Sequence, residues 1–349
     1  MNANRLHIGI IGAGRIGKVH AETAAFRLPE VKIVSITDVD RDAAARLANH
    51  CAIPVVADSS AEIFADPGVD AVLICSPTGT HAELIAQAAR AGKQIFCEKP
   101  VALDLAKIDS ALESVAKAGV KLQIGFNRRF DSNFARVRQA VAGGEIGTPR
   151  LLHIISRDPA PPPISYVKVS GGMFLDMTIH DFDMARFLIA DEVEEIFVSG
   201  GVMVDPEIGA AGDLDTAVIV MRFRNGVIAT IDNCRQAAYG YDQRVEILGS
   251  LGKIATENRY PNQATVSTGK EVRTDLPLNF FMDRYLESFA AELRCFVDAV
   301  IRDKPTPVSG EDGRLAVVLG LAAKKSYEER RPVRLHEMVT PDFAVKDLA

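Results

Sequence analysis

The sequence predicts an α/β protein in which a doubly wound parallel sheet is followed by an α+β domain with a large, mostly antiparallel open sheet. Up to residue 125, short apolar runs alternate with helical stretches. Beyond residue 190, apolar residues recur with period two. The 349 residues suffice for two domains, expected at 1–125 and 126–349. The expected strands are 6–11, 32–37, 55–56, 71–76, 94–97 and 121–125, then 151–156, 195–204, 215–223, 227–234, 244–248 and 253–256.

The composition favours small molecules as partners. Hydrophobic residues make up 48% of the chain and charged residues 25%, as in ordinary globular proteins. The net charge of -6 is spread without a basic block, so neither nucleic acid nor an anionic membrane surface is an expected partner.

Cysteine usage indicates a reducing compartment and no metal site. The five cysteines are far apart and form no C-x-x-C pair, which makes a zinc site unlikely. Cys75 and Cys97 lie in apolar runs that read as buried strands. No run approaches the roughly 18 apolar residues of a membrane span, and the chain opens directly into a strand. We therefore expect a cytoplasmic location.

The first strand leads into a glycine-rich turn. Gly12, Gly14 and Gly17 form G-x-G-x-x-G between the strand and a helix. In such a unit the first glycine permits the turn, the second lets a pyrophosphate approach, and the third allows close helix packing. The turn, including Arg15 and Ile16, is therefore expected to bind a dinucleotide on a Rossmann-type sheet.

An acidic residue ends the second strand. Asp38 follows Gly17 by 21 residues, the spacing at which a carboxylate binds the adenosine ribose and repels a 2′-phosphate. This favours NAD over NADP. Arg41 lies nearby and provides the alternative, since an arginine there can bind the phosphate of NADP.

Two further strand ends are expected to line the cofactor groove. Ser76, Thr78 and His81 follow one strand, although Thr80 with Glu83 also resembles a helix-capping box, which gives this segment a purely structural alternative. Glu98 and Lys99 follow the next strand and precede a proline that restricts the lysine backbone. We expect Lys99 to point into the crevice for the nicotinamide rather than to be an ordinary surface lysine.

A polar stripe lies on an apolar segment in the second half of the chain. Read as one helix from Gly171 to Phe187, the segment places Asp176, His180 and Asp183 on one face. A histidine one turn from a carboxylate suits a general base near neutral pH. A core histidine satisfied by its aspartate is an equally good interpretation of this stretch alone.

The second sheet is expected to have a face that another subunit covers. Ile219, Met221, Ile228 and Thr230 alternate along two strands joined by an Asn225-Gly226 hairpin turn. We expect oligomerisation through that face. Two helices, 283–301 and 311–328, complete the chain, the second docking back on the first domain.

Three motifs occur in one chain in a fixed order: Gly12-x-Gly14-x-x-Gly17, Glu98-Lys99-Pro100 and Asp176-x-x-x-His180. With them the sequence resembles the Gfo/Idh/MocA oxidoreductases over essentially its whole length. The resemblance implies NAD-linked oxidation of myo-inositol to 2-keto-myo-inositol (scyllo-inosose), commonly by a homotetramer assembled through the second sheet. Blocks similar to the bacterial inositol 2-dehydrogenases within this family are Gly125–Asp131, Ser156–Pro159, Ser170–Gly172, Asp176–Met184 and Tyr239–Gln243.

The resemblance also implies residue roles. It assigns catalysis to Lys99, Asp176 and His180. The histidine would be the general base, the lysine would hydrogen-bond the reacting oxygen, and the aspartate would orient the imidazole. The side chains implied near the polyol are Arg128, Asp158, Asp183 and Tyr239.

Other functions remain open at this stage. The nearest is the same chemistry on scyllo-inositol, D-chiro-inositol or a glucose-like sugar, because these rings present similar hydroxyls. An NAD-dependent glycoside hydrolase on the same fold is a second alternative, distinguished by the absence of net NADH. A non-catalytic NAD sensor is a third, although NAD binding alone does not require Lys99, Asp176 and His180.

Overall fold

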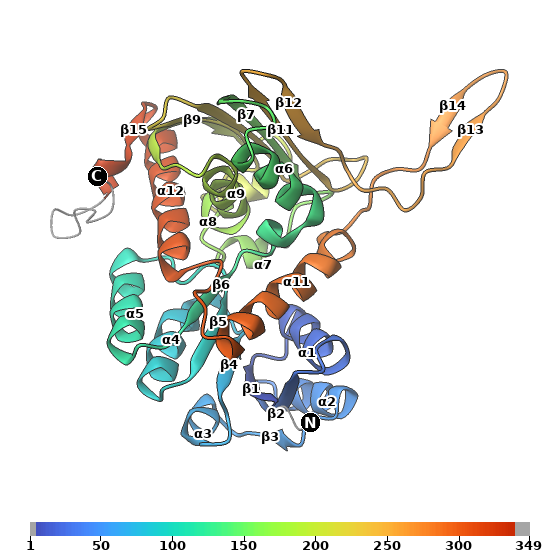
Figure 1. The fold of residues 1–349 in the computed structure, drawn as a ribbon. Coiled ribbons are helices and arrows are strands. Elements are labelled where there is room, and N and C mark those ends of the chain that lie inside the picture. Colours follow the sequence, from blue (N-terminus) through green and yellow to red (C-terminus); the bar gives the residue numbers. More distant parts are fainter. Residues whose placement is uncertain (1–4, 339–349) are drawn as a thin grey trace. The chain divides into compact units, whose positions relative to one another are not determined.

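The computed structural model describes residues 5–338, which fall into two compact units (Figure 1). Unit 1 contains the chain up to Phe130 together with Leu286–Val317, and unit 2 contains Asp131–Tyr285 with the part from Val318 onward. The chain therefore leaves unit 1 close to the expected boundary and later returns to it.

Unit 1 is built on a six-stranded sheet with the order β3-β2-β1-β4-β5-β6, and every pairing in it is parallel. This is the doubly wound order of dinucleotide-binding proteins, so the predicted fold of the first domain is confirmed. The strands are β1 (Leu6–Ile11), β2 (Val31–Thr37), β3 (Val55–Val56), β4 (Ala71–Ile74), β5 (Gln94–Glu98) and β6 (Leu122–Gly125).

Helices alternate with these strands, as the sequence predicts. They are α1 (Arg15–Arg27), α2 (Arg41–Cys51), α3 (Ser60–Ala65), α4 (His81–Arg90) and α5 (Leu105–Ala118), with short 3-10 turns η1 (Thr78–Thr80) and η2 (Asn127–Phe130).

The core of unit 1 also uses a helix from the far end of the chain. Leu293, Phe296 and Val297 of α11 (Phe281–Ile301) are buried with the apolar residues of β1, β2 and β4. The next helix, α12 (Gly310–Glu329), begins in the same unit, where a Cβ on Gly310 would lie 2.4 Å from Leu112 of α5. The first part of α12 thus packs in unit 1, and its remainder belongs to unit 2.

Unit 2 contains a seven-stranded sheet in the order β12-β11-β7-β10-β9-β8-β15. Its pairings are antiparallel except for β7 with β10, which confirms a mostly antiparallel sheet. The strands are β7 (Pro149–Arg157), β8 (Val193–Gly201), β9 (Thr216–Phe223), β10 (Ile228–Cys234), β11 (Asp242–Gly249), β12 (Lys253–Thr256) and β15 (Val333–Arg334). The remaining elements are α6 (Ser132–Ala142), α7 (Ile164–Val167), α10 (Pro206–Ala210) and η3 (Leu335–Met338).

The single helix predicted over 171–187 is wrong in detail. The chain forms α8 (Met173–Asp176) and α9 (Ile179–Ile189), separated by Met177 and Thr178. The Thr178 N–H donates to the carbonyl of Met173, five residues back, at 3.0 Å. Its hydroxyl donates to Asn233 Oδ1 of β10 at 2.6 Å, so a contact with the sheet holds the irregular turn. Asp176 and His180 consequently lie on either side of a break.

The residues of β9 that face outward are not the ones that the sequence predicts. Ile219 and Met221 are fully buried, whereas Val218 and Val220 are exposed, so the proposed outer face uses the other set of positions on β9. Ile228 is exposed as expected. We call this solvent-facing side of the sheet the outer face; its exposed apolar residues are Phe197, Val218, Val220, Ile228 and Leu248.

A second hairpin was not anticipated. Strands β13 (Thr265–Ser267) and β14 (Val272–Thr274) pair only with each other and extend away from the rest of unit 2 (Figure 1). Their residues are all exposed. Neither strand therefore has the alternation of apolar and polar residues on which strand prediction depends.

Within residues 5–338, no helix is long and apolar enough to cross a membrane. All five cysteines are free thiols. Burial raises the pKa of Cys75 and Cys97 well above the ordinary value of a thiol.

Candidate active site

The glycine turn has the geometry expected of a dinucleotide-binding loop. Gly12 has φ 108°, and a Cβ there would lie 2.6 Å from the carbonyl of Cys75. A Cβ on Gly17 would lie 2.0 Å from the Gly12 carbonyl oxygen, so α1 packs against the turn as only glycine allows. A Cβ on Gly14 would meet nothing within 4 Å. The backbone at Gly14 is therefore open to a phosphate at the start of α1, where Arg15 and Ile16 form the first turn.

Asp38 connects the end of β2 to this turn. Its Oδ2 accepts a hydrogen bond from the Ala13 N–H at 2.5 Å, and its Oδ1 accepts one from the Asp40 N–H at 2.8 Å. The carboxylate thus lies at the rim of the glycine turn. Its placement fits ribose recognition by NAD, and the acid also fixes the turn itself.

The segment after β4 is held by its own side chains. The hydroxyls of Ser76 and Thr80 lie 2.7 Å apart, and Thr80 also donates to the Pro77 carbonyl at 2.8 Å. Thr80 is the N-cap residue of α4, but its side chain makes no capping hydrogen bond, so the capping-box interpretation is wrong. Thr78 begins η1 in the same segment and is half-buried.

His81 lies beneath this segment and is almost fully buried. Its Nε2 is 2.7 Å from the Ser76 carbonyl oxygen and its Nδ1 is 2.8 Å from that of Pro100. Burial lowers the pKa of His81, although the two hydrogen bonds and the Glu98 carboxylate oppose that shift. Both ring nitrogens are thus occupied by backbone.

Glu98 and Lys99 are adjacent in sequence but differ in burial. Glu98 is 8% exposed, and its carboxylate lies 2.6 Å from Nε2 of His20 on α1, in the interior of unit 1. Lys99 is half-buried at the carboxyl end of β5 and is joined to Pro100 by a cis peptide bond. Arg128, on η2 of the same unit, is 6% exposed.

In unit 2 the candidate residues gather at one end of the sheet. β7 and β10 are parallel neighbours, so the residues after them, Asp158 and Arg235, emerge at the same edge. The backbones also join there, because the Asp158 N–H donates to the Cys234 carbonyl at 2.9 Å.

Asp176, at the end of α8, is held by two partners. Tyr166 donates its hydroxyl to Oδ1 at 2.9 Å, and the buried Arg235 guanidinium lies 3.4 Å from Oδ2. His180 is half-buried in the first turn of α9, and Asp183 on the same helix is 1% exposed. The carboxylate is thus held by a hydroxyl and a guanidinium at the end of α8, just before the helix that carries the candidate base.

The residues that anchor this helix start are not among those that the sequence motifs indicate. Asn233 of β10 receives the Thr178 hydroxyl and donates from Nδ2 to Asp181 at 2.9 Å and to the Ser156 carbonyl at 3.2 Å. Asn233 and Asp181 are both fully buried. An asparagine inside an apolar strand run, followed by Arg235, was the available signal, because buried polar groups require partners.

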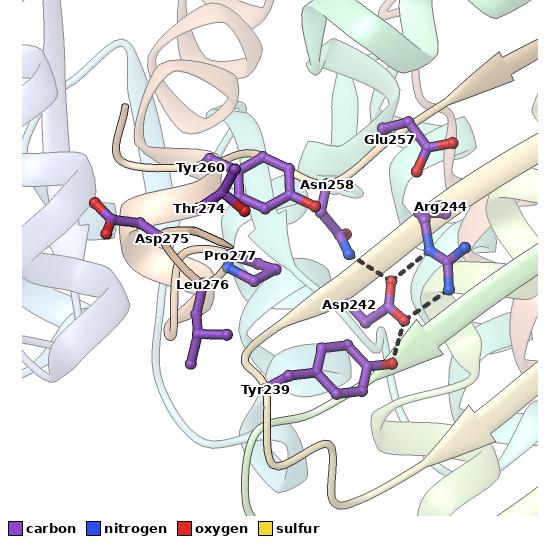
Figure 2. A pocket seen from close by; sticks show the side chains of 10 residues that line it. All are labelled: Tyr239, Asp242, Arg244, Glu257, Asn258, Tyr260, Thr274, Asp275, Leu276 and Pro277. Carbon is purple, nitrogen blue, oxygen red and sulfur yellow. Dashed lines mark hydrogen bonds and ion pairs between the residues drawn. The ribbon is translucent and has the colours of Figure 1, made fainter. Parts of the chain in front are cut away.

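Tyr239 is engaged with charged side chains of neighbouring strands. Its hydroxyl donates to Asp242 Oδ2 at 2.5 Å and accepts from Arg157 at 3.1 Å. Arg157 also pairs with Asp232 at 2.5 Å, and Asp242, Arg157 and Asp232 are cross-strand neighbours on the outer face. We therefore place Tyr239 in an outer-face network, beside a cavity of about 350 Å³ (Figure 2).

Asp242 is the centre of that network. Figure 2 shows Tyr239, Arg244 and Asn258 all directed at its carboxylate. Burial raises the pKa of Asp242, but the hydrogen bonds from these three side chains outweigh burial and hold the pKa below the usual range. The carboxylate therefore remains ionised although it is buried.

The strand order of unit 1, the open backbone at Gly14 and the acid at the end of β2 define an NAD-binding oxidoreductase of Rossmann type. Family comparison agrees. Residues 6–126 match an oxidoreductase family with an NAD-binding Rossmann fold, and residues 134–255 match the GFO/IDH/MocA C-terminal domain. The chain belongs to the Gfo/Idh/MocA family of NAD-dependent oxidoreductases.

Known relatives extend over nearly the whole chain. A myo-inositol 2-dehydrogenase of Thermotoga maritima is 48% identical, covering 96% of this chain and 100% of that protein. An inositol 2-dehydrogenase of Rhizobium meliloti is 44% identical, with coverages of 95% and 99%. A crystal structure of scyllo-inositol dehydrogenase from Lactobacillus casei, with bound NAD(H) and scyllo-inositol, is 30% identical and superposes with a TM-score of 0.89, covering 95% of this chain and 99% of that one.

Cofactor choice can be tested at Asp38. We expect Asp38→Ser to shift the ratio of kcat/KM for NAD over that for NADP about tenfold toward NADP, because the charge that repels a 2′-phosphate is lost. Steady-state rates with both cofactors measure the shift. Asp40→Ser is the matched control, since it removes the same charge two residues away while serine still caps α2. An equal shift in both variants would contradict the assignment.

Proposed function

We propose that the protein oxidises myo-inositol to 2-keto-myo-inositol with NAD. The observation that carries this proposal is the near full-length match to a myo-inositol 2-dehydrogenase at 48% identity. Unit 1 supports it with a dinucleotide-binding turn, and Lys99, Asp176 and His180 are side chains of the types that this reaction requires. NAD, when bound, supplies the hydride acceptor that this reaction requires.

His180 is the proposed general base. Hydride leaves a carbinol carbon only as the hydroxyl on that carbon loses its proton, and an imidazole is suited to accept a proton near neutral pH. Asp176 favours the charged imidazole, and Arg235 with Tyr166 keeps this carboxylate in place. Lys99 hydrogen-bonds the same oxygen and stabilises its developing negative charge.

A cyclic polyol presents many hydroxyls, so its recognition requires several charged or polar side chains that lose a partner when an analogue lacks a hydroxyl. Arg128, Asp158 and Asp183 are the proposed contacts. Arg128 and Asp183 are nearly fully buried, and such groups discriminate well because an unmet hydrogen bond there is costly. Tyr239, whose hydroxyl bonds to Asp242, is the fourth proposed contact.

A second candidate substrate has a specific observation in its favour. The relative of known structure from Lactobacillus casei is a scyllo-inositol dehydrogenase, and scyllo-inositol differs from myo-inositol at a single carbon. D-chiro-inositol and glucose-like sugars present related hydroxyl patterns. An internal hydride cycle, as in NAD-dependent glycoside hydrolases, would give no net NADH.

The substrate assignment is tested by initial rates of NADH formation with myo-inositol, scyllo-inositol, D-chiro-inositol and D-glucose. We expect the highest kcat/KM with myo-inositol and NAD. A higher kcat/KM with scyllo-inositol would change the assigned substrate but not the assigned reaction. No net NADH with any of the four would overturn the proposed reaction.

The proposed roles of Lys99 and His180 are tested by Lys99→Met and His180→Gln. Each is expected to lower kcat by about 10² to 10⁴, because a proton acceptor or a donor to the reacting oxygen is lost, while NADH affinity changes little. Stopped-flow rates and NADH fluorescence measure the two quantities. Lys107→Met and His50→Gln, at exposed positions, are the controls. Full activity in either active-site variant would exclude that residue from catalysis.

We further propose a homotetramer assembled through the outer face, in a reducing, cytoplasmic setting. Exposed Phe197, Val218 and Val220 lie on neighbouring strands, and patches of this kind are usually covered by a partner. The five free thiols support the reducing compartment.

Charge on the outer face should disrupt assembly. We expect Val220→Glu to reduce the mass measured by light scattering to that of a smaller species, because a buried unpaired carboxylate is costly. Phe26→Glu, which alters an exposed apolar residue of unit 1, should leave the mass unchanged. Val220→Glu with an unchanged mass would show that the outer face is not the interface.

A further inference from the structure

One buried side chain links the two strand ends from which the cofactor and catalytic residues of unit 1 emerge. His81 begins α4, and its ring lies between the segment that follows β4 and the segment that follows β5. Nε2 is 2.7 Å from the Ser76 oxygen and Nδ1 is 2.8 Å from the Pro100 oxygen. The ring is 1% exposed, so water does not compete for either contact.

The chemistry of this contact is one-directional. A backbone carbonyl only accepts, so a ring nitrogen bonds to it only where that nitrogen carries a proton. The neutral imidazole carries one N–H and donates to one of the two carbonyls, whereas the imidazolium donates to both. If the ring were absent, the buried Pro100 contact and the partly buried Ser76 contact would both be lost. Two charged groups act on the ring: the Glu98 carboxylate favours its cation, and the Lys99 ammonium opposes it.

The two segments that His81 contacts adjoin the glycine turn and Lys99. The carbonyl of Cys75, next to Ser76, lies against Gly12, where a Cβ would come within 2.6 Å. On the other side, the Pro100 carbonyl belongs to the peptide between Pro100 and Val101, one peptide beyond Lys99. Val101 and Ala102 continue this segment into the core of unit 1. The His81 ring therefore connects the segment beside the glycine turn with the segment that follows Lys99.

We infer that His81 is a positioning residue that clamps the Ser76 segment to the Lys99-Pro100 segment and thereby fixes the backbone from which Lys99 extends. It was expected from sequence to contact the cofactor, but its two nitrogens serve the protein backbone instead. The consequence for catalysis rests on the proposed role of Lys99. The clamp itself does not, because it is a property of unit 1 alone.

The decisive comparison is between His81→Phe and Ile85→Ala. Phenylalanine retains a flat ring but has no donor, whereas Ile85 is a fully buried residue one turn further along α4 that touches neither carbonyl contact. Both variants should lose thermal stability. Only His81→Phe should accelerate amide hydrogen exchange at Lys99, Val101 and Ala102, weaken NADH binding and lower kcat, each by about tenfold, which corresponds to 1.4 kcal/mol.

A second variant and a measurement on the unaltered protein cover the case in which His81→Phe does not fold. His81→Gln retains donors and should recover part of the exchange protection. In protein labelled with ¹⁵N-histidine, the His81 ring N–H, assigned by its loss in His81→Gln, should exchange slowly with solvent.

The outcomes separate the clamp from the proposed reaction. Unchanged exchange at residues 99–102 in His81→Phe, equal acceleration in Ile85→Ala, or a rapidly exchanging ring N–H would each overturn the clamp. If the unaltered protein oxidises no inositol, the exchange and NADH measurements still decide the role of His81.

Discussion

The close approach of α1 to the glycine turn is the constraint on which unit 1 depends. Because the backbone at Gly17 passes next to the Gly12 carbonyl, and Gly12 lies against Cys75, the ends of β1 and β4 and the start of α1 occupy a space that admits no side chain. Asp38 closes the turn from the β2 side. Backbone N–H groups are thereby directed at one point without side chains in the way, which is what binding a pyrophosphate requires.

In unit 2 a buried polar hub, formed by Asn233, Thr178 and Asp181, positions the candidate residues. Asn233 fixes the break between α8 and α9 through Thr178 and the first turn of α9 through Asp181, and so determines where the polar residues of α9 begin. A continuous helix would need no such anchors. The hub is fully hydrogen-bonded and buried, an arrangement that gives a single geometry rather than several of similar energy. Precision at Asp176 and His180 thus originates in the sheet beneath them.

The sequence predicted features that follow from local periodicity and glycine chemistry. The strands of both sheets other than β15, the turn at Gly12 and the acid at Asp38 are of this kind, because each depends on a few neighbouring residues. The break at Thr178, the partners of Asp176 and the orientation of Tyr239 were not predictable, since each depends on a contact with a strand distant in sequence. The outer face was assigned to the wrong set of positions on β9 because period two alone does not state which set faces the core.

The discontinuous make-up of unit 1 has a consequence for how the protein forms on the ribosome. The strands of its sheet are all synthesised within the first 125 residues, yet the core that joins β1, β2 and β4 includes Leu293, Phe296 and Val297. These side chains emerge only after the strands of the second sheet up to β12 have been made. The nascent Rossmann sheet therefore has an uncovered apolar surface while unit 2 is synthesised. During this interval the chain is most prone to aggregate and most in need of chaperones.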